Sequence, residues 1–477
     1  MNANLRRVRG VNDRTSDPTL WSATEQAAAI RERRLGSEEL LDLFLARIDD
    51  VDPVVNAVCT LDADRARTRC RAADAAAARG EWWGPLHGLP ITVKDAIDTE
   101  GIRSTGGATV LADRIAPADA PAVARLKAAG AVVFGKTNLP EWSGDWQSHN
   151  EMFGTTNNPW ATDRTPGGSS GGAAAAVACG MTSFELGTDI GGSVRVPSAF
   201  CGVYGHKPSF GVIPTFGYLD EPSGGAVESD VNTFGPIARS AADLRLLLDI
   251  LAGPHGPAAT AWRLDLPDTD ITGLAGLRIA AWIDEPALEG DAAMTATLHA
   301  AVDAAEAAGA LVDRAARPDI DVDRMWKLGA RMIGAAVSVS DEDQVDGLTH
   351  QRWLRMDRER AGLRAAWAAL FERFDVVLCP VAVVPAFRHL QEGRWDTRTI
   401  TVNGRERRYT EIEGWPALVG AAYLPSTSTP VGRTAEGLPV GIQVVAPFLH
   451  DRRAIAVADA LTRTIGGYAN PPIVLSP

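Results

Sequence analysis

Two adjacent serines, Ser169 and Ser170, lie between two pairs of glycines in the segment "PGGSSGG", residues 166–172. The segment fits the G-x-S-x-G pattern of a hydrolase nucleophile, which requires a strand directly before the serine and a helix directly after it. The preceding residues, "NNPWATDRTP", contain two prolines and a tryptophan and predict no strand. That motif also needs a histidine base, and none of the eight histidines stands out as a candidate. We therefore do not expect either serine to be a nucleophile of this type.

A third serine, Ser193, ends a turn with the sequence "TDIGGS". Successive backbone N–H groups of such a turn can point at one place, and glycines allow a substrate carbonyl to approach them closely. N–H groups fixed in this way stabilise the oxyanion that forms during acyl transfer, each by about 3 kcal/mol. A plain tight turn is the alternative interpretation, because the sequence "GGS" is common.

A lysine interrupts the apolar segment "HGLPITVKDAID", where Lys94 stands next to Asp95. If this segment is a buried strand, the loss of solvation favours the neutral amine, which is a usable general base. The alternative is a lysine whose stem follows the strand and whose ammonium reaches the surface. This lysine and the serines of the two glycine-serine segments are therefore the candidate catalytic residues.

These motifs resemble the amidase signature hydrolases, a family that includes fatty acid amide hydrolase, malonamidase and the glutamyl-tRNA amidotransferase protein of the A type. The resemblance spans nearly the whole chain. Its main motifs are "GPLHGLPITVKD", "GKTNLPEW", "FGTTNNPW", "TPGGSSGG", "GTDIGGSVRVPSAFCGVYGHKPS", "GPIARS", "FDVVLCP" and "GLPVGIQVVAP". Because these motifs agree with the family at many ordered positions, the chain is identified as a member of it.

The resemblance implies a catalytic triad in which Ser193 is the nucleophile, Ser169 the bridging serine and Lys94 the ultimate base. It also implies a cis peptide bond between Gly168 and Ser169. Neutral Lys94 would take a proton from Ser169, which takes one from Ser193 as that serine attacks the amide carbonyl. Water would then hydrolyse the acyl-enzyme at Ser193, and no metal or organic cofactor is needed.

The same resemblance suggests residues that contact the reacting group and the substrate. The oxyanion hole is expected to consist of the N–H groups of Ile190, Gly191, Gly192 and Ser193. The tryptophans at 142 and 146 lie where the family builds its acyl pocket. Trp142 and Ser143 are candidates for contact with the substrate, with ordinary packing as the alternative.

Two polar residues near the serines have expected supporting roles, and a third, His206, has no assigned role. Ser170 is expected to form local hydrogen bonds rather than to react. Arg195 is expected to brace the loop with Asp189 as its partner, and the alternative is that it binds a substrate carboxylate. His206 departs from the family pattern, which usually has an apolar residue there.

The elements that must position these residues are typical of an α/β protein. The resemblance implies the amidase signature fold, a large, mixed, mostly parallel central sheet covered by helices on both faces. The segments "PITVKDAID", "APAVARLKAAG" and "AVVFGKT" predict a strand, a helix and a strand, and therefore parallel pairing of the two strands. The segment "AAAAVACGMTSFELGTD" predicts a buried helix of small residues followed by a short strand.

The second half of the chain continues this alternation. The segments "LRIAAWI", "FDVVLCPVAVVP" and "GLPVGIQVVAP" predict strands, and "AAMTATLHAAVDAAEAAGA" and "RRAIAVADALTRTI" predict helices. Asn403-Gly404 predicts a hairpin turn. We expect a single domain over residues 1–477. Its parts would be a helical lead-in at about 18–80, a signature core at about 81–250, and a helix-rich, variable part at about 321–414 that shapes the substrate pocket.

Composition argues against several classes of protein. The net charge of −13 makes nucleic acid an unexpected partner, because phosphate binding needs a clustered basic face. The five cysteines form no CxxC pair, so neither a disulfide framework nor a zinc site is indicated, and we expect no metal. No run of 18 uncharged apolar residues occurs, and the N-terminus has no apolar signal segment. We therefore expect a cytoplasmic protein that does not bind a membrane.

The resulting hypothesis is an amidase that hydrolyses the C–N bond of a small-molecule carboxylic amide, as a monomer or homodimer. Esters and carbamates are alternative substrates, since they share the acyl-transfer step. The alternative function is that of an A-type subunit of a tRNA-dependent amidotransferase, which releases ammonia from glutamine. That subunit typically has glutamine soon after the signature arginine, whereas this chain has Val196 and Pro197 after Arg195. A non-catalytic protein on the same fold is a third interpretation, which the retention of all three catalytic side chains disfavours.

Overall fold

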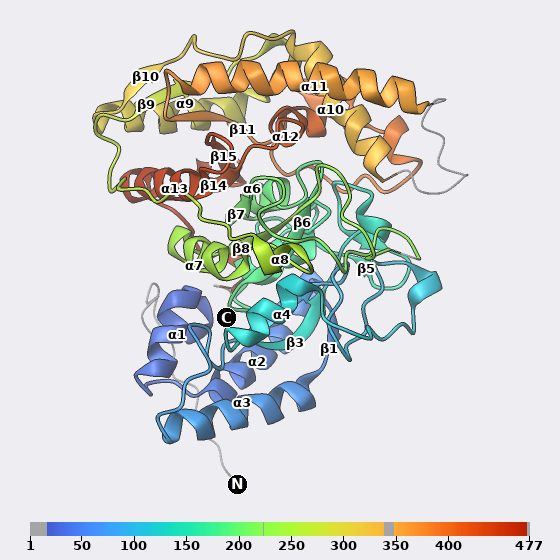
Figure 1. The fold of residues 1–477 in the computed structure, drawn as a ribbon, viewed down its shortest axis with the longest axis vertical. Helices are drawn as coiled ribbons and strands as arrows, with labels where there is room; N and C mark the ends of the chain where they lie inside the picture. Colours follow the sequence, from blue (N-terminus) through green and yellow to red (C-terminus); the bar gives the residue numbers. More distant parts are fainter. Residues whose placement is uncertain (1–16, 223, 338–347, 475–477) are drawn as a thin grey trace.

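The structure is a computed structural model that describes residues 17–222, 224–337 and 348–474. Figure 1 shows the N-terminal helices gathered at one end of the molecule and helices of the second half at the other, with the strands between them. The two main sheets lie in this middle layer: a small sheet of three strands and a large sheet of eight. The site described below is built where these two sheets approach each other.

The N-terminal segment that was predicted to be helical forms three helices. In α2, Leu40, Phe44 and Ile48 recur at helical spacing and are buried, so this face of the helix joins the core beside the small sheet. The three helices are α1 (Ala23–Arg31), α2 (Ser37–Val55) and α3 (Ala63–Ala78).

The three-stranded sheet carries the candidate lysine. Its strands are β1 (Val58–Leu61), β3 (Val132–Thr137) and β2 (Pro90–Lys94), in that order. Strands β2 and β3 are parallel and are connected through α4 (Pro121–Ala128), which confirms the predicted strand-helix-strand unit. Every residue of β2 is buried, so Lys94 at its end has no route to the surface along the strand.

The eight-stranded sheet is mixed, as expected, but it is not mostly parallel. Only β10 with β9 and β9 with β11 pair in parallel, and the other five pairings are antiparallel. The expectation of a mostly parallel sheet is therefore wrong, because a strand that returns through a short turn, as β15 does after β14, pairs antiparallel. In spatial order the strands are β10 (Leu311–Asp313), β9 (Arg278–Ala281), β11 (Val376–Pro380), β15 (Pro439–Val445), β14 (Ser426–Arg433), β7 (Tyr204–Lys207), β8 (Thr233–Ala238) and β6 (Glu185–Asp189).

Helices cover both faces of this sheet, which confirms that part of the expectation. Alternate strand residues face opposite ways: Ile279 and Val376 pack into one hydrophobic cluster, whereas Ala280 and Val377 pack into another. The helices of the first cluster are α9 (Ala292–Ala307) and α13 (Asp451–Ile465), and those of the second are α10 (Val322–Ala336), α11 (His350–Phe371) and α12 (Gly414–Gly420).

The remaining elements are short. The predicted hairpin is confirmed, because Asn403 and Gly404 connect β12 to β13 with φ angles of 52° and 73°. The other helices are α5 (Gly171–Ala178), α6 (Arg195–Cys201), α7 (Ala241–Leu251) and α8 (Ala258–Ala261), and the other strands are β4 (His149–Asn150), β5 (Gly154–Thr155), β12 (Thr399–Val402) and β13 (Arg405–Arg408). The 3-10 helices are η1 (Pro18–Leu20), η2 (Thr109–Leu111), η3 (Glu141–Ser143), η4 (Pro286–Leu288), η5 (Trp395–Thr397), η6 (Tyr409–Glu413) and η7 (Pro472–Val474).

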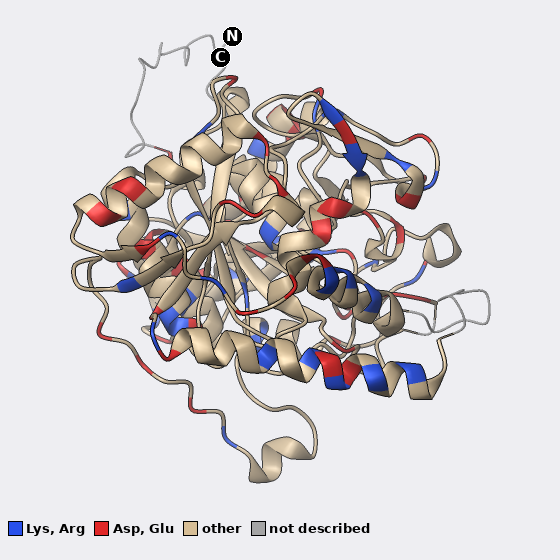
Figure 2. Ribbon diagram, turned by 90° about the horizontal axis from the view of Figure 1, so that it is seen from above, with Lys and Arg blue, Asp and Glu red and all other residues tan. Residues whose placement is uncertain are grey.

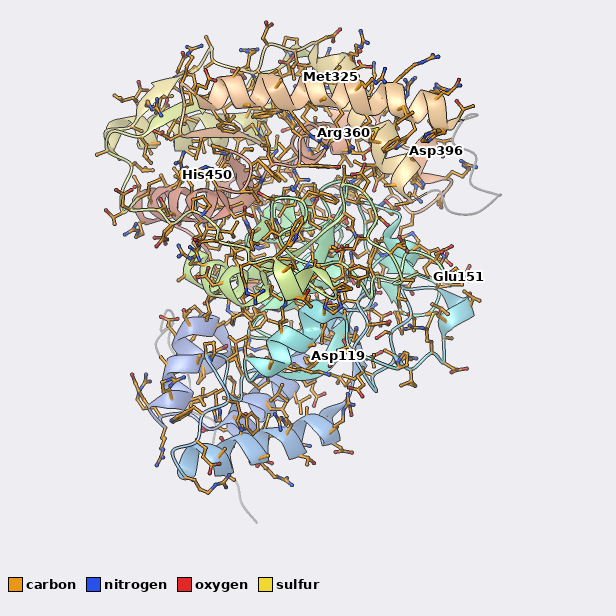
Figure 3. The ribbon with its side chains drawn as sticks, in the orientation of Figure 1. Asp119, Glu151, Met325, Arg360, Asp396 and His450 are labelled. Carbon is orange, nitrogen blue, oxygen red and sulfur yellow. The ribbon has the colours of Figure 1, made fainter. Side chains whose placement is uncertain are left out.

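Charged side chains of both signs are interspersed over the helices seen in Figure 2. One of them reaches inward: Arg360 of α11, labelled in Figure 3, is nearly buried and pairs with Asp230 at 2.7 Å. Within the residues that the structure describes, no helix has the length and apolarity of a membrane span. The division of a single domain into lead-in, core and variable part stays a prediction.

Candidate active site

Lys94 lies at the centre of the candidate site. Its Nζ atom is 2.6 Å from Oγ of Ser169 and 2.7 Å from Oγ1 of Thr188, which belongs to β6. Lys94 and Ser169 are fully buried, and Thr188 nearly so. The fold therefore brings together the lysine of the small sheet, the first serine of "PGGSSGG" and a strand of the large sheet.

The surroundings of Lys94 favour its neutral form. Burial lowers the pKa of Lys94 well below its usual value, and the charges of Asp189 and Glu185 only partly oppose this effect. The alternative of a lysine that reaches the surface is wrong. A neutral amine within hydrogen-bond distance of a serine hydroxyl can accept its proton.

The two serine segments lie side by side. The backbone N–H of Ser170 donates to the carbonyl oxygen of Ser193 at 3.1 Å. The peptide bond between Gly168 and Ser169 is cis, as the family resemblance implied. Among the hydrogen bonds of the described residues there is none between the hydroxyls of Ser169 and Ser193.

Ser193 occupies the strand-turn-helix arrangement that "PGGSSGG" lacks. It lies in the turn between β6 and α6, whereas residues 165–168 before Ser169 have no regular secondary structure. Ser193 is 5% exposed, while Lys94 and Ser169 are completely enclosed. Of these three residues, only Ser193 therefore has any surface exposed to solvent.

Asp189 organises the turn that carries Ser193. Its carboxylate accepts hydrogen bonds from the backbone N–H groups of Gly192 at 3.0 Å and Val194 at 3.1 Å. The structure thus differs from the expected oxyanion hole at Gly192, because an N–H group that donates to a carboxylate is not free for an oxyanion. Among the described residues, the N–H groups of Ile190, Gly191 and Ser193 have no protein acceptor.

Arg195 braces this turn, as expected. Its Nη2 atom is 2.8 Å from Oδ1 of Asp189, both side chains are fully buried, and Nη1 donates to Oε1 of Gln443 at 3.2 Å. Burial disfavours the charge of Asp189, but Arg195, the charge of Lys207 and the backbone N–H of Val194 together more than offset it and lower the pKa of this carboxyl to about 2. The alternative, in which Arg195 binds a substrate carboxylate, is wrong because the guanidinium is enclosed and already paired.

Trp146 holds the other side of the same turn. Its indole N–H donates to the carbonyl oxygen of Gly191 at 2.9 Å, and only 8% of Trp146 is exposed. Because Gly192 N–H is held by Asp189, both ends of the peptide unit between Gly191 and Gly192 are fixed. From the sequence, Trp146 is expected only to lie in the region of the acyl pocket. Its contact with Gly191 has no local sequence signal, because the two residues are far apart in the chain.

Trp142 and Ser143, the candidates for substrate contact, lie in η3 and are partly exposed. Burial raises the pKa of Tyr218 to about 12, although its interactions with Ser143 and Thr188 oppose the shift. Contact of Trp142 and Ser143 with a substrate stays a prediction.

The remaining polar residues singled out from the sequence have structural partners. Ser170 accepts a hydrogen bond from Thr188 N–H and donates one to the Thr188 carbonyl, each at 3.3 Å, so its expected local role is confirmed. His206 is buried in β7, with Nδ1 2.9 Å from Thr427 Oγ1 and Nε2 3.2 Å from Asp451 Oδ1. In the described part of the chain, no three His, Cys, Asp or Glu side chains are grouped so that they could hold a metal ion.

Comparison with known proteins assigns the chain to a family. The family described as Amidase matches residues 39–346 and 330–455 of the chain. A glutamyl-tRNA(Gln) amidotransferase protein of the A type, from Anaeromyxobacter sp. (strain K), is 33% identical over 507 residues, covering 94% of this chain and 97% of that protein.

Two further relatives are hydrolases by name. Indoleacetamide hydrolase of Bradyrhizobium diazoefficiens is 32% identical over 471 residues, covering 94% of this chain and 87% of that protein. The crystal structure of a bacterial aryl acylamidase of the amidase signature family superimposes with a TM-score of 0.84 at 25% identity, covering 96% of this chain and 99% of that one.

Proposed function

The chain belongs to the amidase signature family, and we propose that it hydrolyses small carboxylic amides through a relay of Lys94, Ser169 and Ser193. The observation that carries this proposal is the completely buried contact of 2.6 Å between Lys94 Nζ and Ser169 Oγ. A lysine whose pKa is lowered by burial serves as a base for a serine, and only Ser193 of the three can be reached by a substrate.

The relay begins with Lys94 as the proton acceptor. Lys94 takes the proton of Ser169, Ser169 takes the proton of Ser193, and the Ser193 oxygen attacks the carbonyl carbon of the amide. The two hydroxyls form their hydrogen bond when the substrate is bound, as catalytic hydrogen bonds often tighten only in the complex. Thr188 keeps the amine of Lys94 directed at Ser169 by its own contact of 2.7 Å.

The oxyanion of the tetrahedral intermediate is stabilised by backbone N–H groups of the turn. We assign this role to Ile190, Gly191 and Ser193, whose N–H groups have no acceptor among the described residues. Asp189 and Trp146 hold the turn in place before charge develops. Such preorganised donors need no rearrangement during the reaction.

Reversal of the relay completes the cycle. The proton passes back through Ser169 to the leaving nitrogen, the C–N bond breaks, and the acyl group stays on Ser193 as an ester. Water then attacks this ester with the same base, which releases the carboxylic acid and restores the Ser193 hydroxyl. Esters and carbamates would enter the same pathway, since each presents a carbonyl carbon with a leaving group.

The names of the relatives support aryl and aliphatic amides as the first substrates to test. One relative is an indoleacetamide hydrolase and a structural neighbour is an aryl acylamidase. We propose that the chain works as a monomer or homodimer in the cytoplasm and needs no partner protein. Purified protein should release amine from a panel of amides, and failure with every amide, ester and carbamate would contradict the proposal.

A second candidate function rests on the 33% identity to a protein of the tRNA-dependent amidotransferase. In that role the chain would release ammonia from glutamine. The identity to indoleacetamide hydrolase is nearly the same, so identity alone does not separate the two functions. Assay of the purified chain with glutamine and with aryl amides separates them, because activity on glutamine only in the presence of partner proteins would overturn our first proposal.

A further inference from the structure

A carboxyl group lies directly against the proposed oxyanion turn and takes no part in the relay. Glu413 ends η6 and precedes α12, and it is 6% exposed. A Cβ atom added to Gly191 would lie 3.0 Å from Oε1 of Glu413. The carboxyl therefore fills the space beside Gly191 that a side chain would otherwise occupy, next to the place of the reacting carbonyl.

Glu413 has no partner within the described parts of the chain: no side chain or backbone group there forms a hydrogen bond or ion pair with its carboxyl. Two other buried acids do have hydrogen-bond donors. Glu185 accepts from Thr137 at 3.0 Å, and Asp451 accepts from Ser209 at 2.7 Å. Glu413 keeps 6% of its surface exposed and its oxygens are not among the fully enclosed unpaired atoms of the described residues, so the carboxyl is open to a ligand that could become its partner.

The charged residues on the elements next to Glu413 are already paired with other residues. Asp189 of the turn pairs with Arg195, and Glu285 at the start of η4 pairs with Arg317. The charged residue of the same 3-10 helix, Glu411, pairs with Arg407. Among the described residues, no cation shifts the pKa of Glu413, so none offsets the cost of an ionised carboxyl there.

We propose that Glu413 is a specificity-determining residue whose protonated carboxyl donates a hydrogen bond to an acceptor oxygen of a neutral substrate, beside the scissile amide. The proposal rests on the proposed amidase function and names the class of substrate: uncharged amides with an ether, hydroxyl or carbonyl oxygen near the reacting carbonyl.

Burial decides between a donor and an acceptor role. Burial alone raises the pKa of Glu413 to about 8, so the group is a neutral acid near pH 7. A neutral acid donates one hydrogen bond, which an ether or carbonyl oxygen can accept. A cationic substrate would instead need the carboxylate and would itself lose its solvation on entering this site.

Three isosteric amides test the proposal with the purified protein. Butanamide has an apolar chain, methoxyacetamide replaces one methylene by an ether oxygen, and β-alaninamide ends in an ammonium group. We expect wild-type kcat/KM to be about 10-fold higher for methoxyacetamide than for butanamide, and lowest for β-alaninamide. A second set, one methylene longer, moves the oxygen relative to Glu413.

Two substitutions assign the preference to the carboxyl. Glu413→Gln keeps a donor and should keep the preference for the ether amide, whereas Glu413→Leu should abolish it while butanamide is still hydrolysed. With the ether amide, wild-type kcat/KM should fall as pH rises through about 8, because the carboxyl of Glu413 ionises and can no longer donate a hydrogen bond. Glu413→Gln should not show this fall. Glu411→Gln, in the same 3-10 helix, is the matched control and should behave like wild type.

Several outcomes would overturn the proposal. Equal kcat/KM for the isosteres in both sets, or a preference that survives Glu413→Leu, would exclude Glu413 as the selecting group. A preference for β-alaninamide that Glu413→Gln abolishes would show a carboxylate that binds a cation. Hydrolysis of no amide at all would overturn the proposed function itself, whereas hydrolysis with unchanged ratios would overturn only the role of Glu413. Thermal unfolding of each variant shows whether it is folded.

Discussion

At the scale of single residues, the proposed chemistry depends on the protonation of Lys94. The amine contacts two hydroxyls, those of Ser169 and Thr188, and has no ion-pair partner among the described residues. Burial therefore lowers its pKa, and the charges of Asp189 and Glu185 oppose this shift only in part. A base that is neutral at the working pH can start the relay without first losing a proton to solvent.

The first prediction concerns the three relay residues. Ser193→Ala should abolish turnover because it removes the attacking oxygen, and Ser169→Ala and Lys94→Ala should lower kcat by about 10³-fold or more, since they interrupt proton transfer. Steady-state kinetics on an aryl amide measure these losses. Ser170→Ala is the matched control, because among the described residues the hydroxyl of Ser170 bonds only to backbone atoms of Thr188, and the variant should keep most of the activity. Wild-type rates in any relay variant would reject the mechanism.

The second prediction is a dependence on pH. Because the pKa of Lys94 lies below its usual value and the neutral amine is the active form, kcat/KM should fall as pH is lowered through that pKa. Lys94→Arg has a side chain of similar length that stays cationic and cannot become neutral, so it should be inactive at every pH. An active arginine variant, or a rate that rises as the pH is lowered, would contradict a neutral lysine base.

Residue types that carry chemistry were predictable from the sequence, and their tertiary partners were not. Lys94, Ser169 and Ser193 were identified because they stand in glycine-rich or apolar segments that match a known family. Trp146 and Glu413, by contrast, approach Gly191 from distant parts of the chain. Such contacts depend on packing between elements, which neither spacing nor composition encodes.

At the scale of elements, the turn between β6 and α6 is the part that must be rigid. Trp146 holds one end of the Gly191–Gly192 peptide unit and Asp189 the other. The tryptophan is itself held by its neighbours, since Asp145 pairs with Arg398 at 2.6 Å. Arg398, far along the chain, therefore supports the catalytic turn through the segment around Trp146.

The third prediction tests this support. Trp146→Phe keeps an aromatic ring but loses the N–H group that holds Gly191, so kcat should fall about 10-fold with a smaller change in KM. Trp395→Phe is the control, because Trp395 packs edge-on against Trp146 but is 43% exposed, and none of the hydrogen bonds among the described residues joins it to the turn. A rise in KM alone, with kcat unchanged, would assign Trp146 to substrate binding instead.

The fourth prediction concerns stability. Asp189→Asn leaves the fully buried Arg195 guanidinium without its counter-charge, which should lower the free energy of unfolding by about 3–5 kcal/mol. Asp323→Asn removes an exposed pair with Lys327 and should change the free energy of unfolding by less than about 0.5 kcal/mol. Denaturant unfolding measures both. Equal, small effects would show that the buried pair does not hold the turn.

Local elements were predicted well where periodicity was clear. The parallel pair β2 and β3 and the hairpin at Asn403-Gly404 are confirmed. The position of Ser193 on a strand-turn-helix unit was not predicted from local pattern, although "FELGTD" before it was predicted to be a strand. The G-x-S-x-G match lies at the wrong pair of serines, because this pattern specifies residue types and does not specify the secondary structure around the serine.

At the scale of the whole molecule, the two sheets together create the site. Lys94 ends a strand of the small sheet, and Thr188 belongs to the edge strand of the large one. Neither sheet alone contains the base and the nucleophile. The prediction of one mostly parallel sheet failed here, because pairing among distant strands follows from the connections between them and not from their composition.

The central claim is that Ser193, and neither serine of "PGGSSGG", carries the acyl group. Protein mixed with an excess of an aryl amide or ester, quenched in acid within the first turnover and digested, reports the acylated peptide by mass. The account predicts the added acyl mass on the peptide that contains Ser193, and its absence in Ser193→Ala. Acyl mass on Ser169 or Ser170, with Ser193 unmodified, would contradict it.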